Sequence, residues 1–155
     1  MAVSTMIPPP AYAAAAAGAQ LLLTRGRRPT RVSGLCGLVL AAGSFGVSMT
    51  ADRLFRRYGT TDQPFHPERA SVLVTDGPFA HTRNPMYVGL TGILLGHAAA
   101  RRSATALLPI VGFLAAVDRL QIPAEERNLG AIFGAEYDAY RARVPRWLGP
   151  VHPGS

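Results

Sequence analysis

The feature that most constrains this chain is a run of twenty residues without a charged side chain, Val32–Ala51. An α-helix rises about 1.5 Å per residue, so such a run can cross the roughly 30 Å of hydrocarbon in a bilayer. Only 16% of the 155 residues are charged, and 48% are hydrophobic. Soluble domains typically carry about 25% charged residues. The sequence therefore predicts an integral membrane protein.

Three further apolar stretches accompany this run, at residues 7–23, 85–100 and 104–122. Only a three-residue turn separates the last two, which predicts an antiparallel helical hairpin. The first stretch is rich in alanine, but it lacks the basic region that a signal peptide needs, so we expect a retained first span. We predict an all-α membrane protein of about four transmembrane helices, forming one domain over residues 1–155.

The polar residues fall mainly into two segments. Residues 52–84 contain several prolines and charges and are predicted to form an ordered loop that runs into the third span. Residues 123–144 carry apolar side chains at spacings of three and four, which predicts an amphipathic helix with Pro123 in its first turn. The hairpin would bring both segments to one membrane surface. The tail, 149–155, is predicted to be flexible.

The net charge of +7 comes from sixteen basic residues, all arginine. They flank the apolar stretches, as basic residues do beside anionic headgroups, and this pattern argues against a nucleic-acid partner. Ten lie on the side of the loop and the C-terminal helix and six on the other side, so the positive-inside rule places the loop and tail in the cytoplasm. The composition suggests a bacterial source and hence the inner membrane. Cys36 is the single cysteine and the four histidines show no ligand spacing, so no metal site is predicted.

The densest polar motif lies where the loop meets the third span. Asn84-Pro85 predicts a helix start, with Asn84 as the cap and proline at the first helical position. A helix start favours a bound carboxylate, and the guanidinium of Arg83 beside it could grip one in two places. Tyr87 lies one turn further on. In the C-terminal helix, Glu126 falls on the apolar stripe, where a carboxylate must find a partner such as a ribose hydroxyl, an ammonium or Arg83.

The order and spacing of these motifs resemble the isoprenylcysteine carboxyl methyltransferase family, part of a wider group that includes phospholipid N-methyltransferases. The matching segments cover about residues 59 to 148, including Gly59-Thr60 and Pro64; the motifs are Leu73–Phe79, Arg83–Gly89, Glu125–Leu129 and Phe133–Tyr140. The resemblance implies membrane helices with a cytoplasmic cofactor pocket and no Rossmann domain. The absence of a Gly-x-Gly-x-x-Gly motif agrees with this.

The resemblance also implies that S-adenosyl-L-methionine is the methyl donor and S-adenosyl-L-homocysteine the product. It puts five residues at or near the cofactor site: Arg83, Asn84, Tyr87, Glu125 and Glu126. Of these, we expect Arg83 and Glu126 to act in catalysis. Characterised eukaryotic members have histidine where this chain has Asn84, and asparagine does not titrate near neutral pH. This difference puts in doubt any role for an imidazole at this position. It also weakens the inference that this chain acts on the same substrate as those members.

We therefore expect methyl transfer to a lipophilic acceptor that approaches from the bilayer, with membrane lipids as the other partners. Carboxyl O-methylation of an isoprenylcysteine-like substrate would need no base, whereas N-methylation of a phospholipid amine would, and Glu126 would be the candidate. A non-enzymatic lipid- or partner-binding protein, and a helical reductase without a recognisable nicotinamide motif, are the alternatives. The sequence leaves the acceptor and the oligomeric state open.

Each of these residues also has a purely structural interpretation. Arg83 could be a snorkelling arginine, Tyr87 an interfacial aromatic and Glu125 a solvated first-turn acid. Asp118, at the mouth of the fourth span, is expected to pair with a nearby arginine. The glycines of Gly92-x-x-x-Gly96 are expected to allow close helix packing, and Tyr137 and Tyr140 are expected to pack or to lie at the interface.

Overall fold

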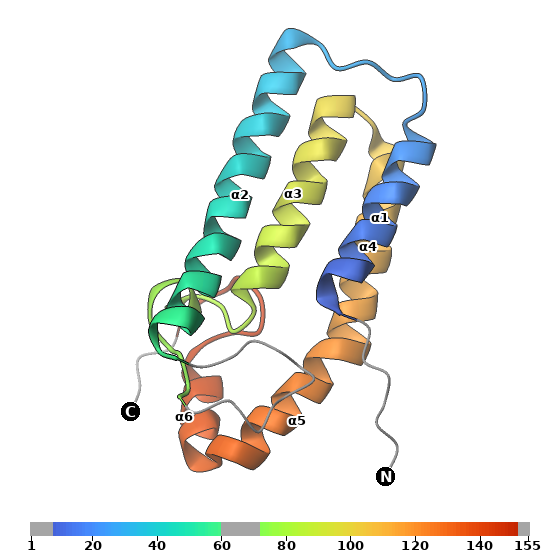
Figure 1. Ribbon diagram of the computed structural model, residues 1–155. Coiled ribbons are helices and arrows are strands. Elements are labelled where there is room, and N and C mark those ends of the chain that lie inside the picture. The colour runs from blue at the N-terminus through green and yellow to red at the C-terminus, as the bar shows by residue number, and fades with distance from the viewer. Residues whose placement is uncertain (1–7, 60–71, 152–155) are drawn as a thin grey trace.

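The computed structural model describes residues 8–59 and 72–151, and within those ranges the chain is helical with no strand. This confirms the all-α prediction. The elements are α1 (Pro9–Leu23), α2 (Arg31–Arg57), η2 (Gly77–Ala80), α3 (Pro85–Arg101), η3 (Ala104–Ala106), α4 (Leu107–Ala116), η4 (Val117–Gln121), α5 (Ile122–Phe133) and α6 (Ala135–Arg143). Helices α1, α2, α3 and α4 lie side by side in a bundle, and α5 and α6 fold away from one end of it (Figure 1).

Three predictions fall wholly or partly outside the described residues. They concern the loop at residues 60–71, the start of the first span before residue 8 and the end of the flexible tail at residues 152–155. The first span is described from Pro9 onward, and α2 continues to Arg57, beyond the predicted end at residue 51.

Two helical stretches are long and apolar enough to cross a membrane, Arg31–Arg57 and Ala104–Phe133. In the first of these, only 6% of the most apolar window is buried inside the protein. Large apolar side chains on α2 point outward, and Leu38, for example, is 65% exposed. A soluble monomer rarely leaves so broad an apolar surface in water. Lipid as the surrounding solvent accounts for it.

Close packing of α2 against α3 depends on glycines. A Cβ atom at Gly96 would lie 2.6 Å from the carbonyl oxygen of Gly37, and a Cβ atom at Gly37 would lie 2.7 Å from the Cβ of Ala100. A side chain at Gly92 would overlap Ser44. Small residues at such positions let membrane helices approach closely. The predicted packing role of Gly92-x-x-x-Gly96 is therefore confirmed.

A fully buried glutamine ties α1 to the rest of the bundle. The Gln20 amide nitrogen donates to the carbonyl oxygens of Leu94 (3.0 Å) and Ala106 (2.8 Å). Its amide oxygen lies 3.1 Å from Nδ1 of His97. A polar group buried away from water must find partners within the protein, so these bonds fix how α1 sits against α3 and η3.

Pro123 lies in the first turn of α5 as predicted, but α5 does not stand apart from the fourth span, because α4 runs without a break through η4 into it. Proline lacks an amide hydrogen and its ring clashes with the carbonyl four residues earlier in a regular α-helix. The π-helical turn of η4, directly before α5, widens the backbone there, and such turns often occur at functional sites. The helix therefore passes through the proline.

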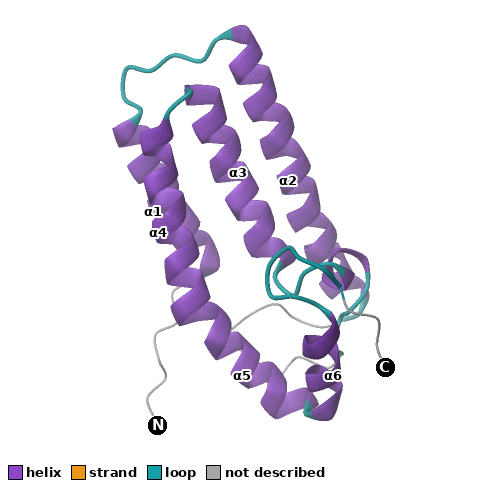
Figure 2. Ribbon diagram, turned by 180° about the vertical axis from the view of Figure 1, so that it is seen from behind, coloured by secondary structure: helices purple, strands orange, loops and turns teal. Residues whose placement is uncertain are grey.

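The single helix predicted over 123–144 is also wrong at Gly134, which separates α5 from α6. Its backbone angles, φ 52° and ψ −123°, belong to a region that residues with a side chain rarely adopt. The chain turns sharply at this glycine. As a result α6 folds back towards the start of α3 (Figure 2).

Candidate functional site

Four segments that are distant in the sequence meet at the end of the bundle where α3 begins. They are the loop before α3, the junction of η4 with α5, helix α6 and the C-terminal segment 144–148. Backbone bonding joins two of them, since the amide of Arg83 donates to the carbonyl oxygen of Pro145 (2.9 Å). The loops and α6 lie together below α2 and α3 in Figure 2.

Glu126 is held between two arginines. Arg83 Nη1 lies 2.7 Å from Glu126 Oε1, while Arg146 donates to both carboxylate oxygens, through Nε (3.1 Å) and Nη2 (2.6 Å). The side chains of Arg83 and Glu126 are only 10% and 14% exposed. Charged hydrogen bonds of this kind are stronger than neutral ones, and the guanidinium fork fixes their direction. Arg83, one of the three partners that the sequence predicts for Glu126, is therefore bonded to it in the structure.

The adjacent carboxylate, Glu125, points to a different set of partners. The Tyr87 hydroxyl donates to Glu125 Oε1 at 2.8 Å, and the Gln121 amide donates to the same oxygen at 2.9 Å. Tyr87 lies in the first turn of α3 and Gln121 ends the π-helical turn. The neighbouring glutamates therefore engage different faces of the site.

Asn84 precedes α3 as predicted, but the predicted side-chain cap is absent. Its amide nitrogen instead donates to the carbonyl oxygen of Arg146 (3.0 Å), which also accepts a bond from the Thr82 hydroxyl (3.0 Å). Thr82 in turn accepts from the Asn84 backbone amide at 3.2 Å. The side chain of Asn84 bonds to the adjacent C-terminal segment and not to the first turn of α3. It fixes that segment, and with it Arg146.

Arg146 also reaches Asp118 in the π-helical turn, with Nη1 3.3 Å from Oδ1. The Trp147 indole donates to the same oxygen at 2.9 Å. The expectation that Asp118 pairs with an arginine is thereby confirmed. The hydrogen bonds to Glu126 and Asp118 hold the pKa of Arg146 above its usual range, so the side chain stays charged.

Two tyrosines of α6 complete the wall of the site. Arg83 Nη1 donates to the Tyr137 hydroxyl at 3.2 Å, and the Tyr140 hydroxyl donates to the Phe79 carbonyl oxygen at 2.7 Å. Both side chains are buried, and this burial raises the pKa of each phenol. They therefore remain neutral. Tyr137 does more than pack, because it contacts the central arginine.

The structure brings the five predicted site residues into one cluster and adds Arg146, Gln121, Trp147 and Tyr137 to it. Sequence reasoning missed Arg146, which follows the two arginines in the last turn of α6. The position of Arg146 in the sequence did not indicate that it would bond to Glu126, because the turn at Gly134 determines where segment 144–148 lies.

One buried hydrogen-bond donor of Arg83 is unused. Its Nε is buried and has no hydrogen-bond partner in the described structure. A buried unpaired donor is costly, so it marks a position where an acceptor from a ligand would be stabilised. A ligand carboxylate could accept a hydrogen bond from this nitrogen, and the amino-acid end of S-adenosyl-L-methionine carries such a group.

Comparison with known proteins agrees with the expectation of a membrane methyltransferase. The sequence profile described as phospholipid methyltransferase matches residues 32–136, which are 105 of the 155 residues. The chain belongs to the phospholipid methyltransferase family. A protein of Haemophilus influenzae described as uncharacterized is 36% identical over 63 residues, which cover 41% of this chain and 100% of that protein. No solved structure matches the chain.

Membership of the phospholipid methyltransferase family confirms the wider group that the motifs indicated, and it implies a membrane methyltransferase. The matched region begins with α2 and ends in the first turn of α6. It contains Arg83, Asn84, Tyr87, Glu125 and Glu126, while α1 and Arg146 lie outside it.

Proposed function

We propose that this protein transfers a methyl group from S-adenosyl-L-methionine to a lipophilic acceptor at the cytoplasmic face of a bacterial inner membrane. The observation that carries the proposal is the partly buried Arg83–Glu126–Arg146 group beside the Tyr87–Glu125 pair. The bound sulfonium would supply an electrophilic methyl group. The residues of the chain bind, orient and exclude water from the reacting groups.

The proposal includes four spans, α1 to α4. The 17 residues of α3 correspond to about 25 Å of helix and the 15 of α1 to about 22 Å, at 1.5 Å per residue. Each is short for a full crossing, but both pack against the longer helices in one bundle (Figure 1). In this arrangement the site lies at a membrane surface, within reach of a soluble cofactor and a lipid.

Arg83 would hold the cofactor carboxylate through its unused Nε, and Glu125 or Glu126 would accept from a ribose hydroxyl or the ammonium group. Both oxygens of Glu126 already bond to arginines. Glu126 could take a proton from an acceptor only if those bonds were disrupted. Glu126 is therefore a poor general base in this arrangement. A positioning role suits it better.

This favours an acceptor that needs no base, such as a prenyl carboxylate of the isoprenylcysteine type. The charge of Arg146 would orient that carboxylate. The sulfonium of the bound cofactor would supply the methyl group, and no proton would have to be removed from the acceptor.

A phospholipid amine is the second candidate, favoured by the description of the family. Transfer to an amine requires a base to take its proton. Because both oxygens of Glu126 bond to arginines, Glu125, which accepts from Tyr87 and Gln121, would be the candidate base.

Titration of S-adenosyl-L-homocysteine into detergent-purified protein tests the cofactor site. We expect saturable binding that weakens at least about tenfold, or 1.4 kcal/mol, in Arg83→Ala or Glu126→Gln. Glu136→Gln, an exposed change on α6, is the control and should bind as wild type does. If folded wild type fails to bind in lipid as well as in detergent, the methyltransferase proposal is wrong, and a non-enzymatic lipid- or partner-binding role replaces it.

The acceptor class is tested with tritiated methyl donor and two acceptors, N-acetyl-S-farnesylcysteine and phosphatidylethanolamine. A methyl ester releases volatile methanol in base, whereas an N-methyl group is stable there. Volatile label from the first acceptor would support carboxyl methylation. Base-stable label on the second acceptor alone would overturn it in favour of the amine.

A further inference from the structure

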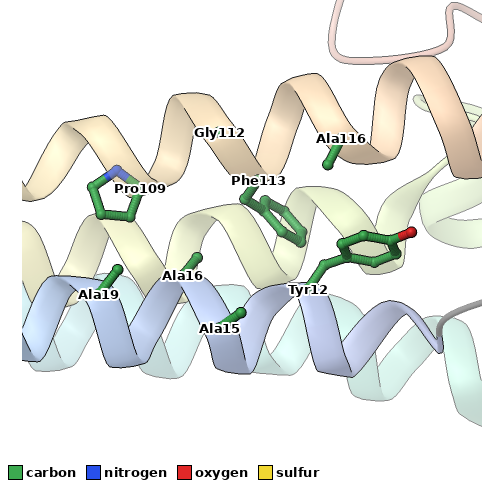
Figure 3. A pocket seen from close by; sticks show the side chains of 8 residues that line it. All are labelled: Tyr12, Ala15, Ala16, Ala19, Pro109, Gly112, Phe113 and Ala116. Atoms are coloured by element: carbon green, nitrogen blue, oxygen red, sulfur yellow. The ribbon is translucent and has the colours of Figure 1, made fainter.

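A groove runs between α1 and α4 in the membrane-spanning part of the bundle, away from the polar site. It has a volume of about 230 Å³ and is open along one side. Figure 3 shows side chains of the two helices facing one another across it, with Pro109 opposite Ala19 at one end and Tyr12 near Ala116 at the other. Its remaining lining residues are Ala15, Ala16, Gly112 and Phe113.

The groove exists because its walls are made of small residues. Three alanines of α1 face a glycine of α4, and a Cβ atom at Gly112 would meet nothing within 4 Å. By contrast, the glycines between α2 and α3 are in tight contact with the opposite helix. Between α1 and α4 the small side chains thus leave a hollow. An apolar hollow of this kind in a membrane suits a hydrocarbon chain.

One end of the groove leads to the functional site. Tyr12 lines the groove and packs against the same core cluster that contains Tyr87, Phe113 and Ile122. Tyr12 lies in the first turn of α1, at the end of the bundle where α3 begins with Tyr87 in its own first turn (Figure 1). Tyr87 donates to Glu125 in the site. From Tyr12 to Ala19 the groove extends along about 10 Å of helix, at 1.5 Å per residue.

We propose that the α1–α4 groove binds the hydrocarbon chain of the methyl acceptor, with the reacting head directed past Tyr12 towards Tyr87 and Glu125. This rests on the proposed methyltransferase function. Because the family match begins only at residue 32, α1 lies outside it. The wall contributed by α1 would therefore set which chain length this protein accepts, while the shared region provides the cofactor site.

The test compares methyl transfer to N-acetyl-S-geranylcysteine and N-acetyl-S-farnesylcysteine, or to didecanoyl and dioleoyl phosphatidylethanolamine if only the amine reacts. Gly112→Leu would place a side chain in the groove from a position where an added Cβ atom meets nothing within 4 Å. Each excluded methylene lowers affinity about fourfold, so we expect KM for the longer chain to rise about tenfold or more relative to the shorter one. Ala15→Leu, from the opposite wall, should act in the same direction.

Matched controls lie on α1 outside the groove. Gly18 also has open space around it, and Ala14 is exposed next to Ala15, so Gly18→Leu and Ala14→Leu make the same changes in composition and helix propensity. Both should retain the wild-type preference. If Gly112→Leu and Ala15→Leu behave like these controls, ordinary bilayer lipid covers the groove and the proposal is wrong.

Binding of S-adenosyl-L-homocysteine separates the two hypotheses. We expect all four variants to bind it as wild type does, because none of the changed residues lies in the Arg83–Glu126–Arg146 group. Normal cofactor binding and activity with an unchanged chain preference would reject the groove alone. Loss of cofactor binding by wild type in lipid would reject the methyltransferase function, and the groove proposal with it.

Discussion

At the scale of single residues, the arrangement around Glu126 predicts energetic coupling with Arg146. Replacing Arg146 by glutamine removes two bonds to Glu126 and leaves that carboxylate, which is only 14% exposed, with Arg83. Truncating one partner of a buried charge pair costs more than the pair itself contributes, because the other charge is left unpaired. Glu126→Gln should therefore destabilise the Arg146→Gln protein less than it destabilises wild type.

A double-mutant cycle measured by unfolding in mixed micelles gives the size of this effect. We expect a coupling free energy of about 1 kcal/mol, which is typical of residues in one network. The pair Arg141–Asp138 on the surface of α6 is the matched control, and its coupling should be much smaller because both side chains are more than half exposed. Additive effects of Arg146→Gln and Glu126→Gln would contradict the arrangement described here.

The residues near the site also indicate what a sequence can and cannot predict. Arg83 and Glu126 were paired correctly as one of three options, because a carboxylate on an apolar stripe requires a partner. Asn84 holds the N-cap position, but the predicted side-chain cap was wrong, since local propensity cannot foresee that this side chain donates to the carbonyl of Arg146 instead of accepting from the first turn of α3. Asn84 and Arg146 are 62 residues apart in the sequence, and only the tertiary fold brings them together.

At the scale of helices, the α2–α3 contact predicts opposite effects for the same substitution. Gly96→Ala places a Cβ atom 2.6 Å from the carbonyl oxygen of Gly37 and 3.0 Å from the backbone of Ala41, so the helices must separate. Gly43→Ala, on α2, meets nothing within 4 Å. Both changes gain helix propensity worth up to about 1 kcal/mol. Only Gly96→Ala must also overcome the clash.

Thermal unfolding in detergent should therefore show a lower midpoint for Gly96→Ala and an equal or higher midpoint for Gly43→Ala. Overpacking of a close contact typically costs about 1–3 kcal/mol. Equal shifts in the two variants would mean that α2 and α3 are not packed as closely as the structure indicates.

Helix positions were easier to predict than helix ends. The uncharged run correctly located α2, but its charged continuation to Arg57 is still helical, since a helix need not end where its apolar residues do. Pro123 correctly predicts the start of α5, but hydrophobic spacing gives no sign of the break at Gly134. The π-helical turn that makes α4 and α5 continuous leaves no mark in that spacing either, and the turn at Gly134 depends on α6 packing against the segment before α3.

At the scale of the whole molecule, charge is distributed unequally between the two ends. Among the described residues, seven acids and nine arginines lie on the side of the site, for a net charge of +2. The opposite end has six arginines and no acid among them, for a net charge of +6. The positive-inside rule depends on the number of basic residues rather than on net charge. By that count we predict that the site faces the cytoplasm, where a soluble methyl donor is available.

Because Cys36 is the single cysteine, orientation can be measured with a membrane-impermeant maleimide in a Cys36→Ser background. We expect Arg28→Cys, in the exposed connection before α2, to react in intact cells, and Glu136→Cys, on α6, to react only after the membrane is opened. The reverse pattern would mean that net charge at the acid-free end outweighs the count of arginines. The site would then face away from the cytoplasmic supply of the cofactor, and the proposed reaction could not take place in that orientation.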